Sequence, residues 1–96
     1  MHEMFYVYIL KSLKSGKFYI GSTNNLQKRL SEHNTDKRVK LYTYRYRPWK
    51  LFMYREFEDE QMARQYEKVV KSYKGGSKFK KIVNGEVAEW SKAAGC

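Results

Sequence analysis

Two short apolar runs near the start of the chain have the composition of β-strands. They cover residues 5–10 and 18–21, and both are rich in aromatic and β-branched side chains. Residues 14–17 between them are Lys, Ser, Gly and Lys, which is typical of a hairpin turn. After the second run comes an Asn that can cap a helix, and side chains then recur at helical spacing: Leu26, Leu30 and His33. The pattern therefore predicts a β-hairpin with a helix leaving from the end of its second strand.

A third strand is expected at residues 49–57, where an alternating pattern is mostly apolar on both faces. Strict alternation divides it into two sets: Leu51, Met53, Arg55 and Phe57 on one face, and Phe52, Tyr54 and Glu56 on the other. Such a strand is typically central in a sheet and covered on both sides. The stretch 35–48 before it alternates Tyr with Thr or Arg and then reaches Pro48. We interpret this stretch as a loop with some extended character.

Two further helices are expected after the third strand. Asp59 is placed to cap the first, because negative charge suits the positive end of the helix dipole. Its apolar stripe is expected to contain five side chains: Met62, Tyr66, Val69, Val70 and Tyr73. The pair Gly75 and Gly76 is placed to end this helix. Ser77 is then placed to cap a last short helix that reaches Val83.

Residues 84–96 lack a pattern that would dock them on the rest of the chain. We therefore expect one folded domain at 1–83 and a disordered tail at 84–96, the alternative being that the tail packs Trp90 on the domain. The run Val87–Trp90 also resembles the conceptual translation of the start of a serine tRNA gene. We hypothesise that the gene overlaps or runs into a tRNA, in which case the tail has no selected function. The nucleotide sequence decides this hypothesis.

Composition narrows the class of protein and of partner. A chain of 96 residues is one domain with a single modest core, and its formal net charge is +10. Such an excess indicates a polyanionic partner, usually nucleic acid; the alternative is a basic protein without one. The sole cysteine, Cys96, excludes an internal disulfide framework and a cysteine-based zinc site. With no membrane-length apolar run and no signal-peptide pattern, we expect a cytoplasmic protein without a membrane partner.

The two predicted strands carry a spaced pair of triplets, Tyr6–Tyr8 and Tyr19–Gly21, with ten residues between them. Arg29 follows eight positions after the second triplet. This arrangement resembles the signature of the GIY-YIG nucleases, with Tyr6 standing where that motif has Gly. The resemblance runs over about residues 4–82. It is nearest to the small stand-alone bacterial members and more distant from the incision nuclease of nucleotide excision repair.

The resemblance implies a fold and a first functional residue. The fold is an α+β arrangement, a three-stranded, mostly antiparallel sheet flanked by helices in the order β-β-α-β-α-α. The family's Ala-x-x-x-Glu-x-x-x-Lys pattern falls on Ala63, Glu67 and Lys71. It makes Glu67 the expected ligand of Mg²⁺ or Mn²⁺, a hard cation that keeps several positions for water and phosphate. The alternative is an ordinary helical ion pair of Glu67 with Lys71.

Phosphodiester hydrolysis also needs groups that hold the phosphate and move a proton. Arg29 is the expected phosphate clamp, since its planar fork stays charged; the alternative is a surface pair with Glu32. By resemblance Tyr19 is the general base, and Tyr8 orients water or phosphate. A free Tyr has a pKa about three units above neutral, so its activation takes about 4 kcal/mol. The alternative for both tyrosines is packing in the sheet.

His33 is expected either to handle a proton or to bond a phosphate, and its alternative is an ordinary residue near a helix end. A basic segment interleaved with Tyr42, Tyr44 and Tyr46 is expected to contact phosphates and stack on bases. Its basic members are Lys37, Arg38, Lys40, Arg45, Arg47 and Lys50. The alternative is that the tyrosines pack on the sheet while the basic side chains are solvated.

Together these features predict a metal-dependent endonuclease that hydrolyses DNA phosphodiesters, with a link to DNA repair or recombination. DNA is favoured over RNA as the substrate. The main alternative is a non-catalytic nucleic-acid-binding module on the same scaffold. A third class, a structural protein or adaptor, predicts no DNA binding even at low salt.

Overall fold

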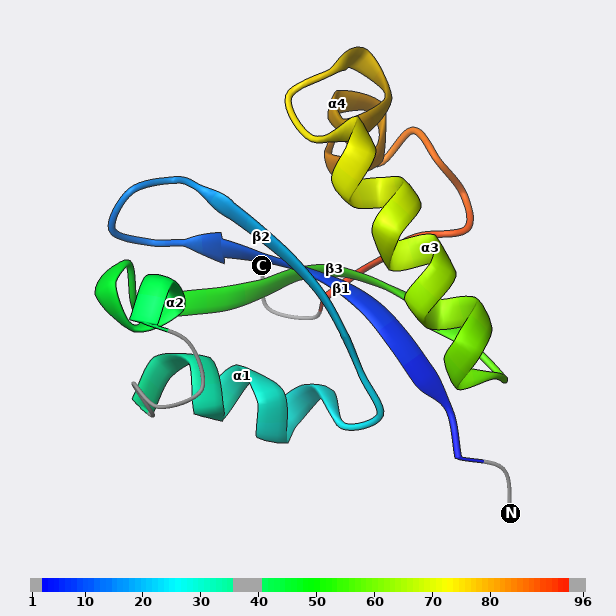
Figure 1. Cartoon of the computed structure of the whole chain (residues 1–96). Helices are drawn as coiled ribbons and strands as arrows, with labels where there is room; N and C mark the ends of the chain where they lie inside the picture. Colours follow the sequence, from blue (N-terminus) through cyan, green and yellow to red (C-terminus); the bar gives the residue numbers. More distant parts are fainter. Residues whose placement is uncertain (1–2, 36–40, 94–96) are drawn as a thin grey trace.

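The computed structural model describes residues 3–35 and 41–93, and its elements alternate short strands with short helices (Figure 1). In chain order they are β1 (Phe5–Ser12), β2 (Phe18–Thr23), α1 (Leu26–Thr35), α2 (Leu41–Arg45), β3 (Trp49–Phe57), α3 (Glu60–Tyr73), α4 (Ser77–Val83) and β4 (Ser91–Lys92). The expected hairpin, first helix and third strand are confirmed. The stretch before β3, expected as a loop, instead contains the short helix α2. None of the helices within these described ranges is long and apolar enough to cross a membrane.

The strands form one antiparallel sheet in the order β2-β1-β3-β4. This confirms the α+β class, although the sheet has four strands where three were expected. The additional strand is only two residues long and pairs with Met53 and Tyr54 of β3. Because β1 lies between β2 and β3, its side chains are covered on both faces, and four consecutive residues, 7–10, are buried.

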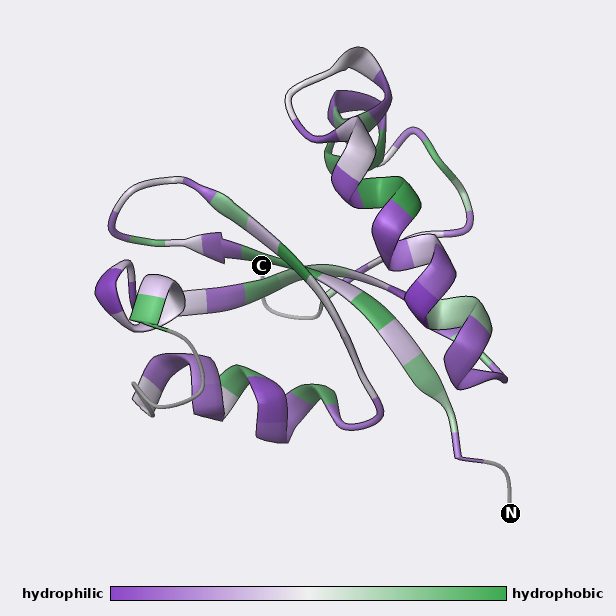
Figure 2. Cartoon of the chain, viewed as in Figure 1, coloured by the Kyte–Doolittle hydropathy of each residue, from purple (hydrophilic) through white to green (hydrophobic). Residues whose placement is uncertain are grey.

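The two faces of the sheet carry separate clusters of side chains. Val7 and Ile9 point to the face covered by α3 and α4, where Val70 is fully buried. Tyr8 and Leu10 point to the opposite face, which α1 and α2 cover (Figure 1). Figure 2 shows hydrophobic positions recurring along β1, whereas most positions of α1 and α3 are hydrophilic and hydrophobic ones are interspersed among them. The candidate chemistry in β1 and α1 therefore lies on the α1 side.

The predicted assignment of β3 side chains to two faces is wrong in the first half of the strand, before Met53. Ile9 pairs with Met53 but Leu10 pairs with Leu51, so Phe52 is an extra residue in a bulge. Leu51 consequently packs with Tyr8 and Leu10, whereas Phe52 and Met53 both pack in the α3 cluster. A bulge reverses the alternation of side chains, which no strictly periodic pattern can show.

The start of α3 is confirmed and its buried stripe is corrected. The side chain of Asp59 accepts hydrogen bonds from the backbone N–H groups of Gln61 and Met62. Met62 and Val69, expected in the stripe, are 56% and 40% exposed, and Ala63 is buried instead. The helix is thus turned slightly from the predicted face, because the sheet accepts the small Ala63 at close approach. Ser77 is the first residue of α4 and not its cap, which is Gly76.

The described part of the tail, residues 84–93, packs on the domain, where fraying was expected. Trp90 is 5% exposed, belongs to the α3 cluster, and donates from Nε1 to the Tyr66 hydroxyl at 3.4 Å. Residues 91–92 then form β4 against β3. One large aromatic side chain is enough to dock a segment whose sequence has no periodicity.

Candidate functional site

The candidate site is built on the pairing of Tyr8 with Gly21 across the hairpin. The register of β1 and β2 places these two residues opposite each other. A Cβ at Gly21 would lie 2.6 Å from Cζ of Tyr8, closer than any real contact of this kind. Glycine is therefore required at this position so that the Tyr8 ring can lie across β2 and reach α1. We expected Gly21 to let the backbone approach a phosphate or turn into the helix, and its contact is instead with Tyr8.

The hydroxyl of Tyr8 ends in a chain of buried polar groups. It lies 2.9 Å from Nε2 of His33, and Nδ1 of His33 lies 2.9 Å from Oγ1 of Thr43. His33 and Thr43 are fully buried, and Tyr8 is 2% exposed. Arg29, one turn before His33 on α1, hydrogen-bonds the Tyr8 hydroxyl oxygen. A guanidinium can only donate, so the Tyr8 oxygen accepts from Arg29, while the direction of the bonds of His33 with Tyr8 and Thr43 is set by the imidazole tautomer.

This environment keeps Tyr8 protonated and Arg29 charged. Burial raises the pKa of the Tyr8 phenol well above its ordinary range, and the bond from Arg29 only partly opposes burial. The charges of Tyr19 and Glu67 raise the same pKa further, so these two groups also lie within electrostatic reach of the hydroxyl. Burial alone would lower the pKa of Arg29, but its bonds with Tyr8 and Glu32 outweigh burial and raise it. Tyr8 is thus a hydrogen-bonding group at neutral pH and not a base.

Tyr19 stands next to this chain and is less enclosed. Its ring lies edge-on to His33 at 4.9 Å between centroids, and 6.5 Å from the ring of Tyr8. It also contacts Trp49 and Tyr42, so that it is half-buried. The structure therefore brings Tyr8, Tyr19, Arg29 and His33 into one connected group of side chains.

Glu67 projects from α3 toward β2. Oε1 accepts a 2.6 Å hydrogen bond from Oγ of Ser22, and Oε2 pairs with Nζ of Lys71 at 2.7 Å. Its side chain is 18% exposed, which matches the expectation of a carboxylate at the margin of the buried stripe. Ser22 was expected to contact phosphate, and its hydroxyl contacts this carboxylate instead.

A single carboxylate fits a hard divalent cation that keeps most of its positions for water and phosphate. No group of three or more His, Cys, Asp or Glu side chains that could hold a metal lies in residues 3–35 or 41–93. In the structure, the ammonium of Lys71 is the cation that contacts Oε2 of Glu67. A metal ligand at Glu67 therefore requires Lys71 to leave that oxygen, while Ser22 keeps the carboxylate in place.

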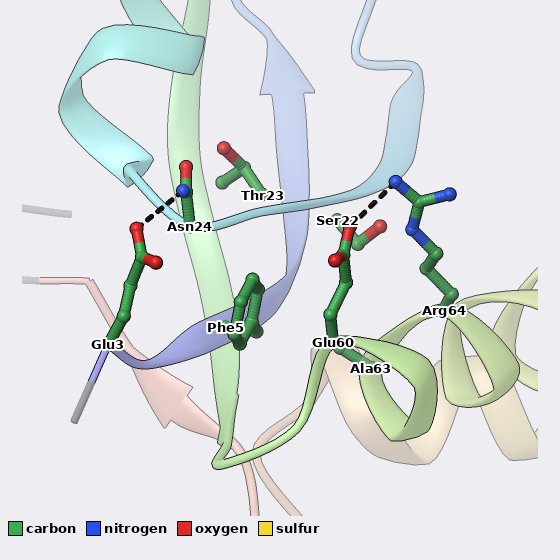
Figure 3. Close-up of a pocket in the computed structure, with 8 residues that line it drawn as sticks. All are labelled: Glu3, Phe5, Ser22, Thr23, Asn24, Glu60, Ala63 and Arg64. Carbon is green, nitrogen blue, oxygen red and sulfur yellow. Dashed lines mark hydrogen bonds and ion pairs between the residues drawn. The ribbon is translucent and has the colours of Figure 1, made fainter.

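A second hollow of about 320 Å³ lies on the other side of Ser22, between β2 and the first turn of α3 (Figure 3). Its acidic side chains already have partners: Glu3 accepts from Asn24, and Glu60 pairs with Arg64. None of the predicted catalytic side chains lines it. The predicted catalytic residues thus lie outside this hollow: Tyr8, Tyr19, Arg29 and His33 on the α1 side of β2, and Glu67 on α3.

The predicted basic segment is only partly described. Lys37, Arg38 and Lys40 lie outside the described residues. Arg47 stacks on Tyr44, with its Cζ 3.7 Å from the ring centroid, and Nζ of Lys50 lies 6.0 Å from the Phe52 ring centroid. Arg45 is exposed at the end of α2. These side chains combine cationic and aromatic surface, as expected, but none joins the group around Tyr8.

Sequence reasoning missed two supporting contacts: the contact of Thr43 with His33, and the hydrogen bond of Ser22 to Glu67. Thr43 stands in an alternation of Tyr with Thr and Arg that indicated an extended chain, so its burial in a helix beside His33 left no periodic signal. Ser22 directly follows the second triplet, and a hydroxyl there can serve phosphate or carboxylate equally well.

Comparison with known proteins gives a family match and several relatives. The family model of the GIY-YIG catalytic domain matches residues 4–81. The chain is 37% identical over 86 residues to the UPF0213 protein CPE1444 of Clostridium perfringens (strain 13 / Type A), covering 90% of each chain. It is 37% identical over 82 residues to the UPF0213 protein OB0043 of Oceanobacillus iheyensis, covering 85% of this chain and 93% of that one. A UPF0213 protein of Bacillus pumilus (strain SAFR-032) is 44% identical over 62 residues, which are 65% of this chain and 61% of the relative.

Proposed function

The chain belongs to the GIY-YIG family, and from this premise we propose that it is a metal-dependent endonuclease that hydrolyses phosphodiester bonds in DNA. Membership of this nuclease superfamily implies a nucleic-acid substrate. The observation that carries the proposal is the gathering of Tyr8, Tyr19, Arg29 and His33 in one group of contacts. Glu67 projects from α3 toward the neighbouring strand β2, where it bonds Ser22 and Lys71. A purely structural hairpin has no need of the four gathered side chains.

Each side chain has a role that follows from its surroundings. Arg29 is charged and partly exposed, so it binds a phosphoryl oxygen and offsets the charge that develops there. Tyr8 accepts from Arg29 and is held by His33, so it fixes the direction of the guanidinium. Tyr19 is the group that accepts the proton of the attacking water.

His33 acts through Tyr8 and not on the substrate. Its ring is fully buried and its two nitrogens bond Tyr8 and Thr43. It is therefore a positioning residue, and direct bonding to phosphate, one of its two expected roles, does not fit this burial. Glu67 would hold a divalent cation such as Mg²⁺ or Mn²⁺, which when bound would supply charge neutralisation at the phosphate. Ser22 holds the carboxylate in the orientation that this ligand needs.

The wider setting is proposed on the same basis. The net charge of +10 and the exposed Arg45 and Arg47 supply affinity for a phosphate backbone, and we propose DNA rather than RNA as the substrate. A role in DNA repair or recombination and a cytoplasmic location fit a small bacterial nuclease of this kind. All the proposed catalytic side chains lie between Tyr8 and Glu67.

The test is nicking of supercoiled plasmid DNA in Mg²⁺ by the wild-type protein and by Glu67→Gln and Arg29→Ala. Matched controls are Glu60→Gln, which changes another carboxylate of α3, and Lys28→Ala, which removes the neighbouring charge on α1. We expect each site variant to lose at least 100-fold in rate, as for removal of one transition-state donor, and each control to stay within about threefold. Equal rates of cleavage by the wild type and by Glu67→Gln would refute the proposed role of Glu67 as a metal ligand.

One observation favours a second candidate, a binding module without catalysis. The carboxylate of Glu67 is already paired with Lys71 and Ser22, an arrangement that is complete without a metal. This candidate predicts salt-sensitive DNA binding that Glu67→Gln leaves unchanged and no cleavage of any DNA in Mg²⁺ or Mn²⁺.

A further inference from the structure

A pocket of about 410 Å³ opens beside Tyr19, and none of Tyr8, His33 and Thr43 lines it. It is lined by side chains of β2, α2 and α3: Tyr19, Ile20, Tyr42, Lys71 and Lys74. Its volume lies in the range of sites that bind small organic groups. The pocket therefore connects a proposed catalytic tyrosine with the lysine that pairs with Glu67.

One wall of the pocket is aromatic. The rings of Tyr19 and Tyr42 lie 6.5 Å apart between centroids and are tilted by only 33°. Tyr42 also packs on Tyr46 at 5.0 Å and on Trp49 at 6.4 Å, so its ring is supported from behind. Even so, 37% of Tyr42 is exposed. An exposed and supported ring is a surface on which another flat ring can stack at low entropic cost.

The other wall is cationic. Lys71 and Lys74 come from the last turn of α3 and from the residue that follows it, and both are exposed. Nζ of Lys74 donates to the backbone oxygen of Phe18 at 2.5 Å, which holds this charge over the start of β2. Exposed ammonium groups attract phosphate. The pocket thus presents a flat apolar surface opposite a site for negative charge, the two features of a nucleotide.

We propose that this pocket takes one unpaired nucleobase of the substrate, stacked on Tyr42 and Tyr19, with a flanking phosphate at Lys71 and Lys74. The inference rests on the proposed function and names its substrate class, a DNA strand with an unpaired nucleotide next to the cleaved bond. A base inside a duplex has both faces covered by its neighbours, so it cannot stack on Tyr42 without leaving the helix. Single strands, gaps and frayed ends meet the requirement directly.

The test measures binding in EDTA, so that no cleavage occurs and the result does not depend on catalysis. The probes are a single-stranded oligonucleotide carrying 2-aminopurine at one position and the same strand paired with its complement. We expect the wild-type protein to prefer the single strand by roughly 10- to 100-fold, the equivalent of one stacked base, and to quench the 2-aminopurine. Equal affinity for the two probes, or the absence of binding to both, overturns the inference.

Variants separate stacking from general attraction. Tyr42→Ala is expected to lose the preference and the quenching, whereas Tyr42→Phe keeps both, because stacking needs the ring and not the hydroxyl. Leu41→Ala is the matched control, since Leu41 precedes Tyr42 on α2, is 61% exposed and does not line the pocket. Unchanged quenching in a folded Tyr42→Ala protein contradicts the inference.

Lys74→Met tests the cationic wall with Lys80→Met, an exposed lysine of α4, as its control. We expect Lys74→Met to weaken single-strand binding and reduce the slope of log K against log salt by about one unit more than the control does. An equal effect of both variants refutes a phosphate contact at Lys74. If the wild-type protein cleaves plasmid DNA but does not quench 2-aminopurine, this inference is refuted and the proposed nuclease function is not. If it quenches 2-aminopurine but cleaves no DNA, the proposed nuclease function is refuted and the binding of an unpaired base is not.

Discussion

Replacing Gly21 by Ala tests the packing on which the whole candidate site depends. The added Cβ would lie 2.6 Å from Cζ of Tyr8, so one of the two must move by several tenths of an ångström or more. Tyr8 cannot move freely, because it is 2% exposed and its hydroxyl bonds His33 at 2.9 Å. The expected consequence is a displaced Tyr8 ring and a broken link to His33.

The magnitude follows from three contributions. Overpacking a well-filled site typically costs about 1–3 kcal/mol, and a lost buried hydrogen bond costs about another 1 kcal/mol. Against these, Gly→Ala stabilises by about 0.4–1 kcal/mol through the unfolded chain. The net destabilisation of Gly21→Ala is therefore about 2 kcal/mol, which lowers the Tm of a domain of this size by roughly 8–16 °C. Cleavage falls as well, since Arg29 loses the hydroxyl that orients it.

Urea unfolding and thermal melts of Gly21→Ala, Tyr8→Leu and the double variant provide the assay. A smaller side chain at position 8 leaves room for the new Cβ. The destabilisation of the double variant is therefore expected to be at least 1 kcal/mol smaller than the sum of the destabilisations of the two single variants. Gly76→Ala is the control, as its Cβ would lie 3.2 Å from its nearest neighbour and meets no ring. If Gly21→Ala is as stable as the wild type, or the two changes are additive, contact with the Tyr8 ring is not what requires glycine at position 21.

Four further measurements test other parts of the structure. Burial raises the pKa of Tyr8, so its contribution to stability is complete below pH 10 and is lost as the pH rises further. Above pH 10, urea melts should show that the free energy of unfolding of the wild type falls by up to about 1.4 kcal/mol per pH unit more than that of Tyr8→Phe. The same pH dependence in both proteins contradicts this. Lys71→Met removes the ammonium from Oε2 of Glu67, so calorimetry should show tighter Mn²⁺ binding than in the wild type, and equal or weaker binding refutes the competition. Trp90→Ala should cost about 3–5 kcal/mol, as for a core aromatic residue; a loss below 1 kcal/mol would show that the tail is dispensable. With about five phosphate contacts, log K for DNA should fall with log salt at a slope of roughly −4.5, and a slope near zero excludes a backbone footprint.

Local features of the sequence were sufficient for the hairpin, α1 and the start of α3. Each depends on residues within one turn or one strand: Gly16 with φ +76° between β1 and β2, Asn25 bonding the backbone N–H of Lys28, and Asp59 capping α3. Such signals act over three or four residues, and they are visible in the order of the side chains alone. The family resemblance added the arrangement of the sheet, which periodicity does not contain.

The errors arose where distant contacts decide the outcome. The bulge at Phe52 follows from the pairing of β3 with β1, and it places Leu51 and Met53 on opposite faces although strict alternation puts them on the same one. The docking of Trp90 depends on a cluster that includes side chains of the sheet and α3, which lie far from Trp90 in the sequence. In α3, the choice between Met62 and Ala63 as the buried residue depends on how near the helix approaches the sheet. None of these outcomes has a local cause.

The candidate site divides along the same line. The resemblance to the GIY-YIG signature, carried by the spacing of Tyr8, Tyr19 and Arg29 along the chain, selected these residues, and the hairpin followed at once by α1 brings them close together. The hydrogen bond of Ser22 to Glu67 joins residues 45 positions apart, and the contact of His33 with Thr43 crosses from α1 to α2. These two contacts orient the carboxylate and the imidazole, so they decide whether the selected residues can act. A sequence pattern can therefore nominate the candidate groups of such a site, while their orientation depends on partners that only the folded chain supplies.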